Sequence, residues 1–151
     1  MKQLSVFLAA LLGLLLLPRG TDVAKLAPAQ LVRVERDGAE IVIRTDLGNV
    51  GRGTNLDAAF EDLKRATPGV VFLDTAQYLV LDENSVSCLE ELSHWVKKTC
   101  RVSIGEGIRD LQGASAYLQT HPPRVKIGES KAGCRDLPHL TELNGRFSIK
   151  Q

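Results

Sequence analysis

The sequence contains no block of basic residues and no acidic run. Its 151 residues include 19 Lys and Arg against 18 Asp and Glu, so the formal net charge is only +1. Nucleic acids are bound through clustered positive charge, so the lack of a cluster disfavours that class of partner. The length is that of one domain, and the charge balance is typical of a globular protein.

Cysteine is also scarce. Cys88, Cys100 and Cys134 are the only three, and no two have the C-x-x-C spacing that is typical of zinc ribbons and thioredoxin-like sites. Three thiols allow one disulfide within the chain and leave one thiol over. Cys88 and Cys100 are the closest pair in sequence, so we predict this pairing if a disulfide forms.

No catalytic motif is recognisable. Ser, Cys and His residues occur, but none lies in the nucleophile–base motif that a hydrolase requires. Residues 51–53 (Gly-Arg-Gly) lack the Lys-Ser/Thr of a P-loop, so a flexible lead into a helix is favoured over a phosphate cradle. Residues 105–107 (Gly-Glu-Gly) follow a predicted strand, but the next glycine, Gly113, is misplaced for a dinucleotide fingerprint. The sequence predicts no catalytic residue, no cofactor and no metal ligand.

Only the N-terminus carries a long, almost unbroken apolar run. Lys2 precedes the apolar residues 4–17, which end at Pro18. A short positive start followed by such a run is typical of a secretory signal, and the run is shorter than the roughly 20 residues of a membrane-spanning helix. Residues 1–29 are therefore predicted to be a signal peptide that ends at the A-x-A triplet 27–29, or an N-terminal membrane anchor if no cleavage occurs.

Residues 70–82 form a strongly apolar internal stretch without Lys or Arg. Its second half, residues 76–81, is predicted to be the central strand of a small sheet. Asp74 and Thr75 interrupt the stretch. They indicate either a bulge or strand start, or a pocket for a small ligand beside the loop that carries Arg52.

The remaining patterns place other elements around this strand. They predict a hairpin over residues 30–45, a short strand over residues 100–104, and helices over the ranges 54–66, 85–98 and 108–120. A strand, a helix and a strand in succession predict parallel pairing. We therefore expect one α/β (α+β) domain over residues 30–121, of order β-β-α-β-α-β-α, with a small mixed sheet and helices mainly on one face. Residues 122–151 are predicted to be an irregular C-terminal extension.

Residues 67–83 (TPGVVFLDTAQYLVLDE) combine a helix end at Thr-Pro with a hydrophobic strand that runs into Asp-Glu. A glycine-led helix precedes them in residues 51–68, and a strand with a short helix follows in residues 101–118. These segments are similar to the N-terminal domain of the Ger(x)C family of spore-germination proteins, and the resemblance covers roughly residues 31–118. The family's lipidated cysteine is absent, because residues 20–22 (Gly-Thr-Asp) stand near its place, and the sequence ends before the family's later domains.

The members of this family are exported lipoproteins of germinant-receptor complexes in the spore inner membrane, and no catalytic residues are known for them. The resemblance therefore implies a protein partner in a membrane or envelope assembly. We expect an exported, extracytoplasmic and non-enzymatic protein-interaction module that is membrane-anchored or secreted. The alternatives are a small exported hydrolase and a small-ligand-binding domain, whose candidate site residues are Asp74, Thr75 and Arg52.

Overall fold

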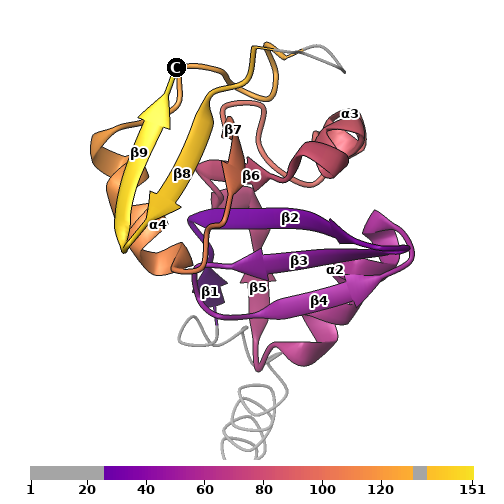
Figure 1. Ribbon diagram of the computed structural model, residues 1–151. Coiled ribbons are helices and arrows are strands. Elements are labelled where there is room, and N and C mark those ends of the chain that lie inside the picture. The colour runs from indigo at the N-terminus through magenta and orange to yellow at the C-terminus, as the bar shows by residue number, and fades with distance from the viewer. Residues whose placement is uncertain (1–25, 131–135) are drawn as a thin grey trace, which may run out of the picture.

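The computed structural model describes residues 26–130 and 136–151. The predicted signal segment, up to residue 25, and Cys134 lie outside the described residues. The described chain forms a seven-stranded mixed sheet of order β4-β3-β2-β6-β7-β8-β9, with helices packed on it (Figure 1). This architecture confirms the predicted α+β class and the mixed sheet.

The elements fall in an order that mixes strands with short and longer helices. In chain order they are β1 (Leu26–Pro28), β2 (Leu31–Asp37), β3 (Glu40–Thr45), β4 (Val50–Gly53), α2 (Leu56–Ala66), β5 (Val70–Phe72), the 3₁₀ helix η2 (Leu73–Thr75), β6 (Tyr78–Leu81), the 3₁₀ helix η3 (Glu83–Cys88), α3 (Leu89–Leu92), β7 (Arg101–Glu106), α4 (Leu111–Thr120), β8 (His139–Leu143) and β9 (Arg146–Lys150).

The predicted hairpin is confirmed as β2 and β3. The strands are antiparallel and joined by a two-residue turn that begins at Gly38, whose φ is +63°. Glycine adopts this left-handed conformation without strain. Val34 lies opposite Ile43, and both belong to the larger hydrophobic cluster together with Val32 and Ile41, so the alternating residues share one buried face as expected.

The centre of the sheet is parallel. β6 pairs in parallel with β2 on one side and with β7 on the other, which confirms the predicted parallel unit. Leu79 and Leu81 belong to the cluster beneath α2 and α3, whereas Tyr78 and Val80 belong to a second cluster beneath α4. Because successive side chains of a strand point to opposite faces, α4 covers the face opposite α2 and α3. The helices α2 and α3 thus share one face, as expected of helices mainly on one face, and α4 lies on the other.

The apolar stretch 70–82 contains the predicted central strand, β6, which begins at Tyr78 rather than at residue 76. The first part of the stretch is β5, which pairs in parallel with β1 in a separate two-stranded sheet, and only β6 joins the main sheet. Ala29, directly after β1, is fully buried. The boundary predicted at residue 30 is therefore wrong, because β1 and Ala29, which precede it, belong to the fold.

The second predicted helix, 85–98, is much shorter than expected. Only η3 and the single turn of α3 form. Ser93 donates its hydroxyl to the Glu90 carbonyl at 2.6 Å, and the His94 ring lies 3.2 Å from the Glu91 carbonyl. These side chains compete for carbonyls that a longer helix would use, which favours an end at this point. Trp95 lies in the turn that follows.

The ends of the other two helices also differ slightly from the predicted ranges. The helix predicted from residue 54 begins slightly later, because the side chain of Asn55 caps α2 by accepting a hydrogen bond from the Ala58 amide at 2.8 Å. α4 begins at Leu111, later than predicted, because the side chain of Asp110 caps it. Capping side chains of this kind fix where a helix starts.

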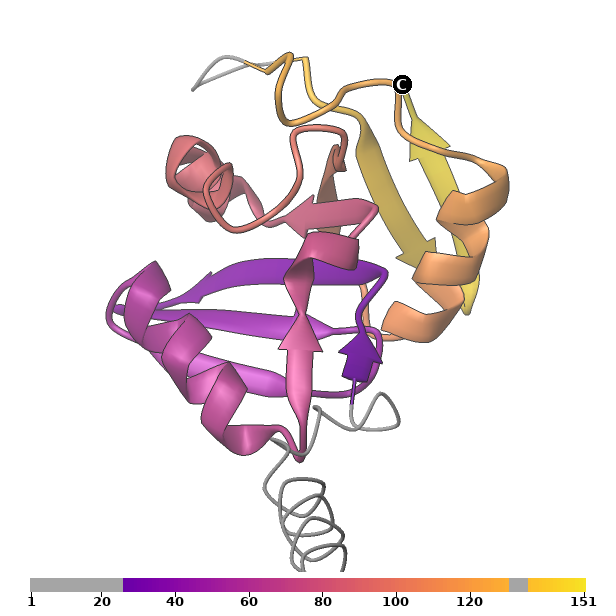
Figure 2. The same ribbon diagram turned by 180° about the vertical axis from the view of Figure 1, so that it is seen from behind.

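The C-terminal segment is not an irregular extension. β8 pairs in parallel with β7, and β9 pairs antiparallel with β8, so residues 139–150 complete the sheet. The turn between them is Asn144-Gly145, with φ values of 51° and 72°, as the Asn-Gly pair indicates. Leu140 is fully buried against α4. Figure 2, the view from behind, shows this hairpin at the edge of the sheet beside α4.

Candidate functional site

The residues proposed from the sequence line a pocket, but structural contacts already use part of it. Asp74 and Thr75 line a pocket of about 270 Å³ at the start of β6 and β7, together with Lys97 and Arg101. The Thr75 hydroxyl donates to the carbonyls of Ala29 and Phe72, at 3.1 and 2.6 Å. These bonds tie η2 to the end of β1, so Thr75 has a structural role here.

The pocket also contains Tyr78. Burial raises the pKa of Tyr78 above its ordinary value of 10.0, although the nearby positive charge of Arg101 acts in the opposite direction. Neither histidine nor cysteine occurs in the described lining of this pocket. The arrangement therefore holds exposed charges of both signs without a nucleophile–base pair.

The structure does not bring Arg52 to Asp74 and Thr75. Arg52 lies in β4, an edge strand that β3 and β2 separate from β6, and forms ion pairs with Asp37 and Glu40, each at 3.8 Å. The composite site expected from the three residues is therefore not formed. Both ion pairs are exposed, so they contribute little stability.

The glycines beside Arg52 are neither a flexible lead nor a phosphate cradle. They form β4, and α2 packs directly on them. A methyl group at Gly51 would overlap the backbone of Ala59 and Leu63, and one at Gly53 would overlap Ala58 and Ala59. The two glycines are therefore required for the close approach of a helix to a strand.

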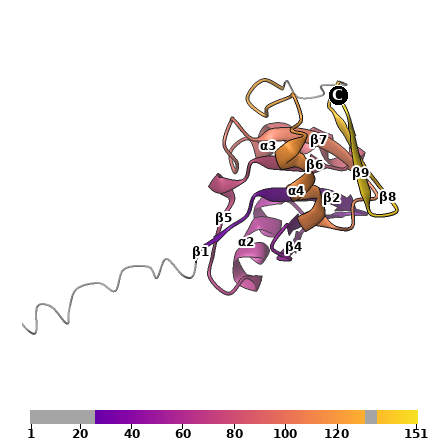
Figure 3. The same ribbon diagram turned by 90° about the vertical axis from the view of Figure 1, so that its left-hand side faces the viewer.

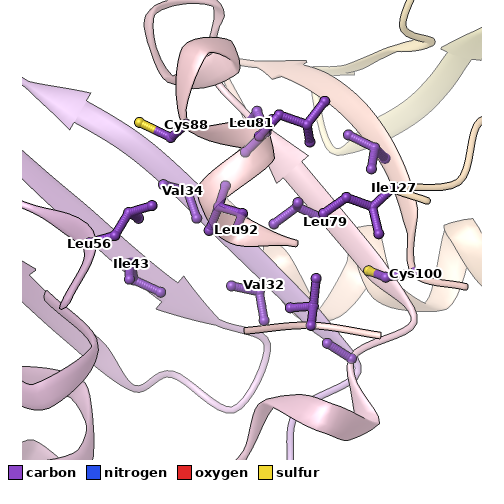
Figure 4. Close-up of a cluster of buried hydrophobic side chains, with 14 of the residues drawn as sticks. Val32, Val34, Ile43, Leu56, Leu79, Leu81, Cys88, Leu92, Cys100 and Ile127 are labelled. Carbon is purple, nitrogen blue, oxygen red and sulfur yellow. The ribbon is translucent and has the colours of Figure 1, made fainter. Parts of the chain in front are cut away.

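Cys88 and Cys100 are buried free thiols, so the predicted disulfide is not present. Figure 4 shows them on opposite sides of the hydrophobic cluster, with Val34, Leu79 and Leu92 between them. Burial raises the pKa of Cys100 to about 12. A thiol with such a pKa is almost entirely protonated near neutral pH and is a poor nucleophile.

The β8–β9 hairpin presents a polar face that the sequence did not single out. His139, Thr141, Ser148 and Lys150 line one side of it, at a surface pocket of about 790 Å³. Thr141 and Ser148 lie opposite each other with their hydroxyls 2.7 Å apart. We call this surface the open hairpin face. It is the face turned away from α4.

The other side of β9 packs on α4. Phe147 and Ile149 are half-buried there, and the ring of Phe147 lies 5.9 Å from that of Tyr117. The side chains of β9 therefore alternate between half-buried apolar residues and exposed polar ones. This alternation could have indicated a strand from the sequence.

β9 is the last strand of the sheet, with no further strand beside it among residues 26–130 and 136–151. Leu143 and Arg146 flank a two-residue turn, so they form a hydrogen-bonded pair. Antiparallel pairs alternate in type, and the N–H and C=O groups of Phe147 and Ile149 consequently point away from β8. They make no backbone hydrogen bond across this edge to the described residues.

Comparison of the chain with protein-family models, with curated proteins and with solved structures gives no match. In the part of the chain that the structure describes, no helix is long and apolar enough to cross a membrane. Nor do the described residues bring three or more His, Cys, Asp or Glu side chains together as metal ligands.

Proposed function

We propose that this protein is an exported, non-enzymatic protein-interaction module that binds an extended segment of a partner at the free edge of β9. The observation that carries the proposal is the row of backbone groups at Phe147 and Ile149 that point away from β8. An added strand would satisfy these groups, and strand addition at a sheet edge is a recurring mode of peptide recognition.

The other edge of the sheet is less suited to strand addition. β4 has four residues, and the amide of Arg52 already donates to the Asp62 carboxylate of α2 at 3.0 Å. α2 packs along this strand. The β4 edge is therefore short and partly satisfied by the helix next to it.

The side chains of β9 define the chemistry of the partner. Arg146 and Lys150 are exposed on the open hairpin face and form no ion pair with any described residue, whereas Phe147 and Ile149 lie on the α4 side. A complementary strand would place acidic residues over the first side and apolar residues over the second. Two copies of β9 paired antiparallel about Ser148 would set Arg146 against Lys150, and this like-charge contact disfavours self-association.

Export and membrane assembly form the second part of the proposal. The N-terminal apolar run supports export, and the resemblance of residues 31–118 to the Ger(x)C domain supports a partner in an envelope assembly. The first described strand, β1, begins at Leu26. A retained N-terminal segment would therefore enter the domain at β1.

Site-specific photo-crosslinking in the producing cells tests the proposal. A photoreactive residue at Ser148 should yield one discrete adduct, and the same residue at the exposed Asp57 of α2 should yield none. Ile149→Pro should abolish the adduct because proline lacks the outward N–H, whereas Ile149→Ala loses the side chain but keeps the N–H and should retain it. An adduct that persists in a folded Ile149→Pro variant would exclude strand addition at this edge.

A further inference from the structure

A groove lies between the sheet and the start of α4, away from the β9 edge. It consists of two adjoining pockets of about 290 and 300 Å³, which share Arg44, Arg109 and Leu111 as walls. One wall comes from β3 and the turn after it, and the other comes from the loop between β7 and α4. We call it the Arg44–Arg109 groove.

At the inner end of the groove, one carboxylate is shared by two arginines. Glu35 lies 3.0 Å from a terminal nitrogen of Arg33 and 2.8 Å from Nε of Arg44. Arg33 also donates to the carbonyl of Ile108 in the loop before α4. Glu35 thus holds the Arg44 side chain in place by its Nε, and the terminal nitrogens of Arg44 are left for another partner.

The other carboxylates of the groove are engaged by the protein itself. Asp46 accepts hydrogen bonds from the backbone amide of Gln30 at 3.2 Å and from the hydroxyl of Ser115 at 3.1 Å. Asp110 caps α4 by accepting from the amide of Gly113 at 2.9 Å. Neither carboxylate forms an ion pair with an arginine of the groove among the described residues.

Uncommitted donors therefore remain on two side chains. The terminal nitrogens of Arg44 and the whole guanidinium of Arg109 make no hydrogen bond or ion pair with the described part of the chain. The backbone of Arg109 is nevertheless fixed, because its amide donates to Glu142 at 2.6 Å. The guanidinium of Arg44 is thus held by Glu35 on one wall of the groove, and Arg109 is held through its backbone on the other wall. Both side chains line both pockets and keep free donors there.

We infer that the Arg44–Arg109 groove binds a small molecule that carries a single carboxylate or phosphate group. The planar fork of a guanidinium matches both groups and forms charge-assisted hydrogen bonds with them. Asp46 and Asp110 line the same groove and would repel a second negative charge, so a polyanion fits less well. The pocket volumes limit the ligand to a small molecule. This inference does not depend on the proposed binding at β9.

An NMR titration tests the inference. The isotope-labelled protein is used as it is isolated from the expressing cells, whether or not its N-terminal segment has been removed. Sodium acetate and sodium phosphate are the probes, and sodium chloride at equal ionic strength is the reference. We expect saturable amide shifts at Asn49 and Gln112, which line the groove. Saturation with acetate alone assigns a carboxylate ligand, saturation with phosphate alone assigns a phosphate ligand, and saturation with both assigns a general oxyanion site.

Arg109→Gln should weaken this binding by about tenfold, the loss expected for one charge-assisted hydrogen bond, without changing the melting temperature. Arg124→Gln is the matched control, because Arg124 is also exposed and its guanidinium is unpaired among the described residues, but it lies outside the groove. Shifts that chloride reproduces, that never saturate, or that Arg109→Gln leaves unchanged would overturn the inference.

Discussion

The substitution Gly51→Ala tests the contact on which the position of α2 depends. Gly51 is buried in β4, and an added methyl group would overlap the carbonyl oxygen of Ala59 and the amide nitrogen of Leu63. Both atoms belong to the backbone of α2, so no change of rotamer relieves the overlap. The helix must move, and with it the fully buried side chains of Leu56 and Phe60.

The expected loss of stability is large for the addition of one methyl group. Overpacking of a well-packed site costs typically 1–3 kcal/mol, and the rigid neighbours at Gly51 place the substitution near the upper end, at about 3 kcal/mol. The lower entropy of the unfolded alanine chain offsets only about 0.4–1 kcal/mol of this. Domains are stable by about 5–15 kcal/mol, and the net loss corresponds to a melting temperature lower by about 10 °C.

Urea and thermal unfolding, followed by circular dichroism, measure the effect. Gly38→Ala is the control, because the turn residue Gly38 has φ of +63° and no atom within 4 Å of an added methyl group. It should cost only the conformational strain of about 1–2 kcal/mol. A Gly51→Ala protein as stable as the wild type, or more stable, would refute the argument and support the flexible connector that the sequence alone suggested.

Three further predictions concern the ends of the domain and its buried thiol. Removal of residues up to Ala29 should lower the melting temperature relative to a chain that begins at Leu26, because only the longer chain keeps β1 and the buried Ala29. Leu140→Ala should destabilise by about 2–5 kcal/mol in urea unfolding, since Leu140 is fully buried, whereas an irregular tail would tolerate it. Cys100 should react with a thiol reagent only after unfolding. Its pKa is raised from 9.0 to about 12, so the unfolded state releases its proton first, and the free energy of unfolding should fall as the pH rises from 9.0 towards 12.

The sequence predicted best the elements whose signals are local. The β2–β3 hairpin follows from alternating residues on both sides of Gly38, and α2 follows from an apolar stripe that ends at Thr67-Pro68. In both cases the residues that form the contacts are close in sequence. Pattern and structure therefore agree, apart from a shift of one residue at the cap Asn55.

The sequence did not predict the elements that depend on distant partners. β5 is a strand because it pairs with β1, which lies more than 40 residues earlier in the chain. The three residues of β5 alone do not indicate that partner. The glycines of β4 resemble a loop until α2 is seen to pack on them. The short α3 reflects competition by Ser93 and His94 for carbonyl groups, which a helical pattern of apolar residues does not reveal.

The candidate sites were harder still to predict, for the same reason. Asp74 and Thr75 were noticed because they interrupt an apolar run. In the structure they belong to the 3₁₀ helix η2, so the interruption marks a turn between two strands. The free backbone groups of β9 exist only because no strand lies beyond it in the described sheet. The Arg44–Arg109 groove joins residues that are far apart in the chain, so no motif could have indicated it.

The position of β9 relative to β1 bears on whether a tethered protein could use the proposed edge. Figure 3 places β1 and β5 on one side of the domain and β8 and β9 on the other. In Figures 1 and 2, β9 also runs away from β1, so that its C-terminal end lies at the opposite end of the domain. A membrane that holds the protein through a segment entering at β1 would therefore leave the C-terminal end of β9 at the far end of the domain. Strand addition at β9 is therefore compatible with both the anchored and the released form.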